Sequence, residues 1–269
     1  MPLDDQGQST VGSEQSRPDG RLPSITAFFP ALNDVHTIAS LVERVEAILS
    51  AATDDYEVVV VDDGSTDGTG ALLDELARRR THLRVVHHPQ NRGYGAALRT
   101  GFGAATKELV FYTDGDGQYD VTELTTLLPL MRQDVDLVNG YKLERADKPH
   151  RVALGAVYNR VASTAFRLPI RDVDCDFRLI RRRALRGIEL ESSTGAICVE
   201  LVHKLHAGGA VFAEAPVHHY PRSHGRSQFF TPRHVLRTVV DLSVLWAGLV
   251  ISRCRSALAA GRASERAQA

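Results

Sequence analysis

The chain has 269 residues, of which 43% are hydrophobic and 24% charged, so it can fold around one large core or two small ones. Its formal net charge of −1 gives no electrostatic reason to expect a nucleic-acid partner. Three widely spaced cysteines without a C-x-x-C pair argue against a disulfide framework or a zinc site and fit a reducing cytoplasm.

The first residues predict a tail, a strand and a helix. Residues 1–24 are rich in Gly, Ser, Gln and Asp and lack the charged-then-apolar order of a signal peptide, so we expect a disordered tail. "ITAFF" (25–29) predicts a short buried strand that ends at Pro30. Apolar side chains spaced three and four apart over 38–49 then predict a helix.

The next hundred residues alternate between strand and helix patterns. "EVVVV" (57–61) is a continuous β-branched run, as in parallel strands that are covered on both faces. At least four alternations with short connections predict an α/β domain on a mostly parallel sheet, which we expect to span 25–234. The other predicted strands are 83–87, 108–113 and 135–141, and the other predicted helices are 69–80, 95–105 and 122–133.

From about residue 145 the pattern changes. The chain becomes rich in arginine, as in "RDVDCDFRLIRRRALR" (171–186), and its helices are less clearly separated by strands. No Pro- or Ser-rich linker isolates this half, and no internal repeat is visible. We therefore expect it to complete a site over the same sheet.

Three polar clusters follow predicted strands: "PALND" (30–34), "DDGSTDGT" (62–69) and "DGDGQ" (114–118). Ligands of such sheets bind beyond the carboxyl ends of the strands. The three clusters are therefore expected to converge on one site.

The third cluster has the composition of a divalent-metal site. If the segment is extended, Asp114 and Asp116 project to the same side, with backbones about 6.5 Å apart. Gln118 adds a neutral oxygen, and oxygen donors suit Mg²⁺ or Mn²⁺. Gly115 and Gly117 carry no side chain that would block a ligand. The alternative is a polar turn without a ligand, because Asp and Gly are ordinary turn residues.

An ordered set of motifs resembles a known family. "PALND", "VVVDDGSTDGT", "NRGYGAALRTG" and "YTDGDGQYD" are similar, in order and spacing, to GT-A family-2 glycosyltransferases, and more closely to polyprenyl-phosphate mannose or glucose synthases. "CDFRLIRRRAL" and "PRSHGRSQF" resemble later elements of that family, and the match covers roughly residues 24–245. The resemblance implies a Rossmann-like GT-A fold and metal-dependent sugar transfer.

The resemblance also implies residue roles at the donor site. Asp114 would approach the ribose or a metal-bound water, with Gly115 beside it, while Asp116 and Gln118 would hold the metal against the donor diphosphate. This chain has Leu32 and Asp34 where the family usually has Tyr and Glu, which leaves the base open. The residues expected to line the base and ribose are Pro30, Leu32, Asp34, Val61 and Asp63.

Basic residues are candidates for the acceptor. A lipid phosphate would bring a second anion, for which the candidates are Lys142, Arg151, Arg222 and Arg226; solvated surface charge is the alternative. Lys142 replaces the arginine that the family commonly has, so it lacks the bidentate fork. The resemblance implies in-line displacement with inversion. A phosphate acceptor, with a second pKa of about 6, needs no strong base, whereas a hydroxyl acceptor needs one, with Glu200, Asp174 and Asp176 as candidates.

The end of the chain allows two interpretations. Residues 235–252 form an apolar segment that Arg237 and Asp241 interrupt, shorter than the ~20 residues needed to span a bilayer. It is either a terminal helix packed on the domain or an amphipathic helix at the membrane surface, followed by a basic, disordered tail at 253–269.

These observations lead to one main hypothesis and two alternatives. The main hypothesis is an enzyme, peripheral at the inner face of the membrane, that moves a hexose from a GDP- or UDP-linked sugar to a polyprenyl phosphate. The first alternative keeps the chemistry but uses a hydroxyl acceptor on a glycan or small metabolite. The second is a sugar-nucleotide-binding subunit without catalysis.

Overall fold

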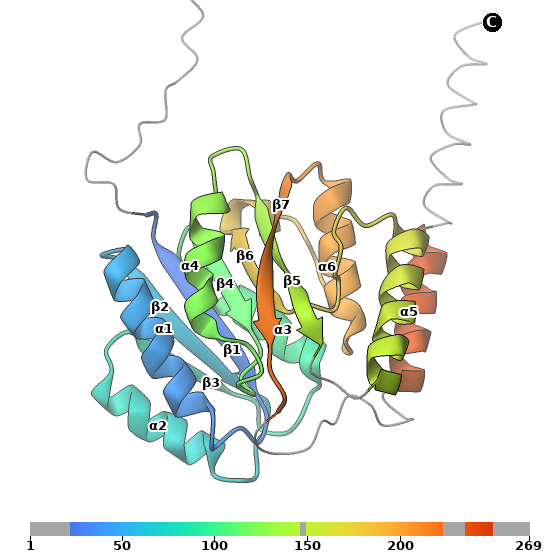
Figure 1. Ribbon diagram of the computed structural model, residues 1–269. Helices are drawn as coiled ribbons and strands as arrows, with labels where there is room; N and C mark the ends of the chain where they lie inside the picture. Colours follow the sequence, from blue (N-terminus) through green and yellow to red (C-terminus); the bar gives the residue numbers. More distant parts are fainter. Residues whose placement is uncertain (1–21, 146–148, 223–234, 250–269) are drawn as a thin grey trace, which may run out of the picture.

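The computed structural model describes residues 22–145, 149–222 and 235–249 (Figure 1), and no side chain between 144 and 154 is described. The expectations for residues 1–21, Arg226 and the tail after 249 lie outside these ranges. The side chain of Arg151, in the first turn of a helix, is likewise not described.

Seven strands form one sheet in the order β3-β2-β1-β4-β6-β5-β7. β6 pairs antiparallel with both of its neighbours, while the other pairings are parallel. The mostly parallel α/β fold is therefore confirmed, and the second half of the chain adds strands to the same sheet. The strands are β1 (Ile25–Ala31), β2 (Tyr56–Asp62), β3 (Leu83–His87), β4 (Leu109–Thr113), β5 (Leu137–Arg145), β6 (Phe177–Arg181) and β7 (Phe212–His219).

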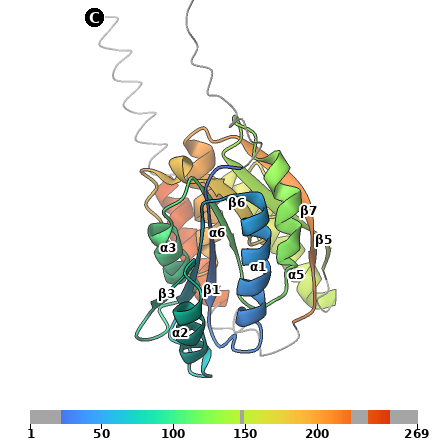
Figure 2. The same cartoon turned by 90° about the vertical axis from the view of Figure 1, so that its left-hand side faces the viewer.

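Helices cover both faces of the sheet (Figure 2). On one face, apolar side chains of α1, α2 and α4 pack with β-strand residues such as Phe29 and Phe111; on the other, α3 and α6 pack with residues such as Phe28 and Tyr112. Alternation along β1 sends Phe28 and Phe29 to opposite faces, which is why the strand reads as a continuous apolar run. The helices are α1 (Ile38–Ala52), α2 (Thr69–Arg79), α3 (Tyr94–Ala104), α4 (Leu124–Leu127), α5 (Pro149–Phe166) and α6 (Ala196–Ala207).

Two element boundaries near the start differ from the sequence prediction. β1 continues through Pro30 to Ala31, because the pairing with β4 has ended by Phe28 and the missing N–H of Pro30 costs no ladder bond. The folded part also begins before residue 25: the backbone N–H of Leu22 donates to the carbonyl of Ala52 (3.3 Å), and Ser24 is buried.

The predicted helix at 122–133 is also different. The structure has a short α4 between two 3-10 turns, Val121–Glu123 and Leu128–Leu130. Pro129 lacks the backbone N–H that a continuing α-helix would use, so the segment does not extend into a regular helix.

Residues 235–249 form a helix beside α5, drawn in red in Figure 1. Leu242, Leu245 and Leu249 of this helix pack against a buried cluster that includes Phe166 and Val199. Thr194 also donates a hydrogen bond to Asp241 (2.8 Å). The segment is therefore docked on the domain through one of its faces.

Candidate active site

Three loops meet at the carboxyl edge of the sheet, as the motifs predict. The backbone N–H of Asn33 donates to the Ser65 hydroxyl (2.9 Å), joining the loops after β1 and β2. The N–H of Gly115 donates to the Pro30 carbonyl (3.2 Å), and the Thr37 hydroxyl donates to the Gly115 carbonyl (2.9 Å), joining the loops after β1 and β4. These bonds fix the relative positions of the three polar clusters.

Asp116 and Gln118 share one basic partner, Arg222. Nη2 of Arg222 contacts Oδ2 of Asp116, and its Nε donates to Oε1 of Gln118 (3.4 Å). The Asp116 side chain is 11% exposed and that of Arg222 27%. The two predicted metal ligands therefore already face a common positive charge.

Asp114 lies deeper, beside further carboxylates. Its Oδ1 accepts a hydrogen bond (2.8 Å) from the hydroxyl of Tyr94, which is the first residue of α3. Burial, followed by the negative charges of Asp176 and Asp116, raises the pKa of Asp114 well above its usual value. The hydrogen bond from Tyr94 and the charge of Lys142 act in the opposite direction but are weaker. This accumulation of negative charge favours a cation.

Asp34 faces the same charges from the opposite loop. Burial raises its pKa from 3.8 to about 6, and the charge of Asp116 adds to the rise, while the N–H of Leu32 and the charge of Arg222 oppose it. The Leu32 N–H donates to Oδ2 of Asp34 (2.9 Å). Asp34 thus lies beside Asp116 and Arg222, and its carboxyl group takes up a proton more readily than an ordinary aspartate.

The glycines of the third cluster serve the backbone. A Cβ at Gly115 would lie 2.8 Å from the Pro30 carbonyl oxygen, so Gly115 allows the loop to pack on β1 rather than keeping a path open for a ligand. Gly117 has a φ of +73°, which residues with a side chain rarely adopt.

Two residues predicted to line the nucleotide are occupied elsewhere. Asp63 is buried and accepts hydrogen bonds from the backbone N–H groups of Arg92 (3.0 Å) and Gly93 (2.9 Å), and it contacts Nδ1 of His88 (2.5 Å). Its carboxylate therefore holds the turn before α3. Val61 is fully buried in the core on the α3 side, so its side chain cannot reach a ligand.

Lys142 also has a partner within the protein. Its Nζ contacts the carbonyl oxygen of Asp174 and lies 3.3 Å from a carboxylate oxygen of the same residue. The Lys142 side chain is only 7% exposed. An acceptor phosphate would therefore have to compete with Asp174 for this ammonium group.

Glu200 does not have the surroundings of a general base. Its carboxylate accepts the backbone N–H groups of Glu191 and Ser192 (both 2.9 Å) and pairs with Lys204 (2.7 Å). Burial would raise its pKa, but the hydrogen bonds from Lys204, Ser192 and Glu191 outweigh burial and lower it. Glu200 thus anchors residues 191–192 on α6, which corrects the prediction of a catalytic role.

A buried arginine organises the far side of the site. Arg178, on β6, has no exposed surface and donates to the carbonyl of Val173 (2.7 Å) and to the side chain of Asn139 (2.7 Å). It also contacts the Tyr112 hydroxyl and lies 3.4 Å from Asp176. Asp176 is thereby held close to Asp114.

The hydrogen bond from Tyr94 to Asp114 could not be predicted from the sequence. A tyrosine in "NRGYG" is equally typical of the first residue of a helix.

The donor set fits a divalent cation of the Mg²⁺ or Mn²⁺ kind. Within the described residues, no three His, Cys, Asp or Glu side chains form a metal cage. Such cations take one or two carboxylates from the protein and complete their shell with water and substrate phosphates. A guanidinium already lies between the oxygens of Asp116 and Gln118 as a stand-in cation.

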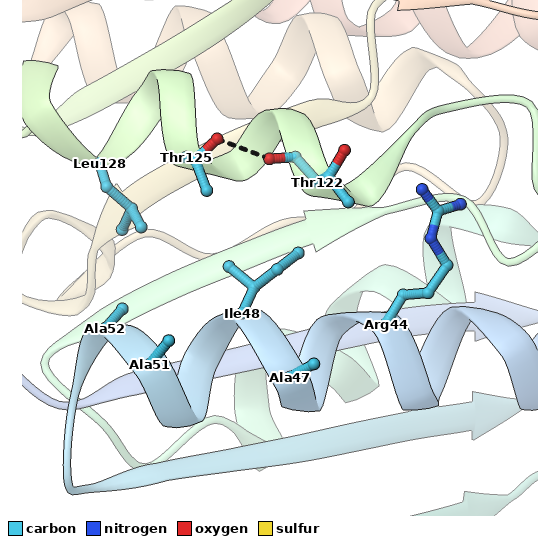
Figure 3. Close-up of a pocket in the computed structure, with 8 residues that line it drawn as sticks. All are labelled: Arg44, Ala47, Ile48, Ala51, Ala52, Thr122, Thr125 and Leu128. Carbon is cyan, nitrogen blue, oxygen red and sulfur yellow. Dashed lines mark hydrogen bonds between the residues drawn. The ribbon is translucent and has the colours of Figure 1, made fainter.

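A separate groove lies on the outer face of the molecule, between the second half of α1 and the segment around α4 (Figure 3). It has a volume of about 540 Å³ and an apolar floor. None of the predicted site residues lines it. The lining residues are Arg44, Ala47, Ile48, Ala51, Ala52, Thr122, Thr125 and Leu128.

Known proteins are similar to this chain in sequence. The chain is 26% identical over 206 residues to an undecaprenyl-phosphate 4-deoxy-4-formamido-L-arabinose transferase of Enterobacter sp. (strain 638), which covers 76% of the chain and 62% of that relative. The chain thus spans less than two thirds of the relative's length.

Solved structures show the same fold at low identity. Glucosyl-3-phosphoglycerate synthase from Mycobacterium tuberculosis, in complex with Mn²⁺ and UDP-glucose, aligns with a TM-score of 0.59 at 19% identity, covering 84% of this chain and 78% of that one. A mannosyltransferase from Pyrobaculum calidifontis in complex with GDP-Man and Mn²⁺ aligns with a TM-score of 0.54 at 22% identity, covering 76% and 58%.

The profile of glycosyl transferase family 2 matches residues 26–188, which include β1 to β6 and the loops that carry Asp34, Asp114 and Asp116. The match extends over more than half of the chain, and the fold agrees with it. The chain belongs to glycosyl transferase family 2 and is a glycosyltransferase.

Proposed function

We propose that this glycosyltransferase moves a hexose from a GDP- or UDP-linked donor to a polyprenyl phosphate, with inversion at the anomeric carbon and with Mg²⁺ or Mn²⁺. The observation that carries the proposal is the set of Asp114, Asp116 and Gln118 beside Arg222 at the carboxyl edge of the sheet. The curated relative named above is an undecaprenyl-phosphate transferase, and solved relatives bind UDP or GDP sugars with Mn²⁺.

The site residues would have separate roles toward the anionic donor. Asp116 and Gln118 would hold the cation, and Asp114, steadied by Tyr94, would face the ribose or a metal-bound water. The cation would act as a Lewis acid on the leaving diphosphate. Pro30, Leu32 and Asp34 border the same loop and would flank the nucleotide.

The surroundings of Glu200 favour a phosphate acceptor over a hydroxyl. A phosphate monoester is already largely an oxyanion at neutral pH and needs no strong base. Glu200, the first candidate for such a base, is committed to Lys204 and to residues 191–192. Arg222 lies at the site and supplies a charge suited to a phosphate.

A peripheral contact with a membrane is part of the proposal. No helix among the described residues is long and apolar enough to span a bilayer. The helix at 235–249 nevertheless leaves large apolar side chains outside, which would suit the interface where a lipid phosphate resides. The exposed side chains are Leu236 (64%), Val239 (53%), Val240 (52%), Val244 (67%) and Trp246 (49%).

The test is transfer of radiolabelled sugar into an organic-extractable product. The purified protein would be incubated with undecaprenyl phosphate, Mn²⁺ or Mg²⁺, and in turn UDP-glucose, GDP-mannose and a nucleotide-linked 4-deoxy-4-formamido-L-arabinose. We expect extractable label with one of the two hexose donors and none with D116A. Label from the arabinose donor alone would keep the lipid acceptor but contradict the hexose, because arabinose is a pentose. Extractable label with none of the donors would contradict the lipid acceptor.

A further inference from the structure

Arg222 contacts both side chains that are proposed to hold the metal. Its guanidinium contacts Oδ2 of Asp116 and the side-chain oxygen of Gln118. A divalent cation of this kind binds oxygen at about 2.1 Å, so it cannot share these oxygens with a guanidinium that carries a positive charge of its own.

The backbone places Arg222 at this position. The N–H of Tyr220 donates to the Gln118 carbonyl (2.8 Å), and the Gln118 amide donates to the Tyr220 carbonyl (3.1 Å). Tyr119 and His219 form a β-bridge next to them. Arg222 therefore begins two residues beyond a clamp that joins the end of β7 to the acidic loop, so its side chain can leave Asp116 without moving the clamp.

We propose, on the basis of the function proposed above, that Arg222 is an exchangeable cation: it neutralises Asp116 in the empty site and is displaced by the divalent metal onto an anionic phosphate. A phosphate brought to the site would offer the displaced guanidinium a bidentate anionic partner. Metal binding would therefore prepare the site for the acceptor phosphate, and the reaction would favour metal and donor binding first.

Charge balance supports the exchange. Without a metal, the negative charge of Asp116 is balanced by the guanidinium of Arg222, which contacts Oδ2 of that carboxylate. A metal of charge +2 would balance the negative charge of the carboxylate and leave an excess of positive charge at the site. The guanidinium is then repelled from the cluster and attracted to the added phosphate.

The first test measures Mn²⁺ binding without nucleotide, by the EPR signal of free Mn²⁺, in the wild-type protein, R222A and R44A. Arg44 pairs with Asp120 of the same loop but touches neither proposed ligand, so R44A controls for the loss of a nearby charge. If Arg222 covers the site in about nine of ten molecules, R222A binds Mn²⁺ about tenfold more tightly than the wild type. R44A should match the wild type.

The outcomes separate this inference from the proposed function. Equal affinities in all three proteins, or equal tightening in R222A and R44A, overturn the exchange and leave the transferase standing. Failure of all three to bind Mn²⁺ even with UDP overturns both. If R222A is poorly folded by circular dichroism, R222Q takes its place, since it keeps the length and loses the charge.

The second test needs no metal. Inorganic phosphate binding is measured by calorimetry in the wild type, D116N and D116N/R222A. D116N releases Arg222, so its phosphate affinity should rise about fivefold or more, the lower range of coupling between sites. The double variant should lose the gain. Equal affinities in D116N and D116N/R222A would show that the gain comes only from the lost carboxylate, and would overturn the exchange.

Discussion

Two turns at the same edge of the sheet use their aspartates in opposite ways. Asp63, after β2, is saturated by two backbone N–H groups and His88, all provided by a neighbouring turn of the protein. Asp116, after β4, accepts the N–H of Gln118 and otherwise faces a partly exposed guanidinium. The motifs "DDGS" and "DGDG" look alike in composition, yet only the second keeps its carboxylate for exchange.

The difference lies in which partner would have to be given up. Backbone N–H groups cannot move away without unfolding a turn, and a buried donor that is left unpaired costs about 1–3 kcal/mol. A side chain can rotate out at the cost of one partly screened ion pair. We therefore expect Asp63 variants to change stability and Asp116 variants to change activity.

The largest expected effect is in D116A. Loss of a metal ligand should reduce the rate of sugar transfer about 1000-fold, equivalent to about 4 kcal/mol of transition-state stabilisation. The midpoint of urea unfolding of the metal-free protein should stay close to that of the wild type. D120A, in the same loop, is the matched control and should retain most of the activity.

D63N should show the reverse pattern. An amide group in place of one carboxylate oxygen faces the Gly93 N–H and cannot accept its hydrogen bond. We expect the free energy of unfolding to fall by about 3 kcal/mol in urea titrations. A D63N protein as stable as the wild type but without nucleotide binding would remove the contrast between the two turns.

D34N is expected to stabilise the metal-free protein at neutral pH. Because the pKa of Asp34 rises from 3.8 to about 6 on folding, ionisation opposes folding above pH 6. The stability linked to the protonated carboxyl is complete below pH 3.8 and is lost as the pH rises through 6. After allowance for solvent screening, the gain in D34N should be about 2 kcal/mol at pH 8 and should vanish near pH 4.

The smallest effect on activity is expected in E200Q. The glutamine loses the ion pair with Lys204 and one acceptor for residues 191–192, so the free energy of unfolding should fall by about 3 kcal/mol, as in D63N, because both carboxylates are buried and accept two backbone N–H groups. The turnover number should change by less than about threefold. A turnover near zero in a folded E200Q protein would return Glu200 to the role of base and favour a hydroxyl acceptor.

Most of the first half of the fold could be predicted from its sequence because strand, turn and helix signals are local there. The continuous apolar run before Asp62 and the polar cluster after it place β2 and its loop without further information. The convergence of the three clusters follows from the rule that parallel strands share a carboxyl edge.

The partners of the site residues could not be predicted in the same way. Arg222 and Asp116 are 106 positions apart, and the partners of Asp63 are 25 to 30 positions away. Hydrophobic periodicity in the sequence does not indicate such pairs, because they depend on how β7 and the turn before α3 return to the carboxyl edge of the sheet. Sequence composition therefore indicates an acidic site but not which carboxylates are already satisfied.

The docked terminal helix has a practical consequence for anyone who shortens this protein. Because its valines and its tryptophan are exposed, removing everything after residue 234 looks like a way to improve solubility. The same cut would strip Leu242, Leu245 and Leu249 from the hydrophobic cluster around Phe166 and Val199. Replacing Val244 and Leu236 by polar residues is safer, because it changes only the exposed face of the helix and leaves the contacts of Leu242, Leu245 and Leu249 intact.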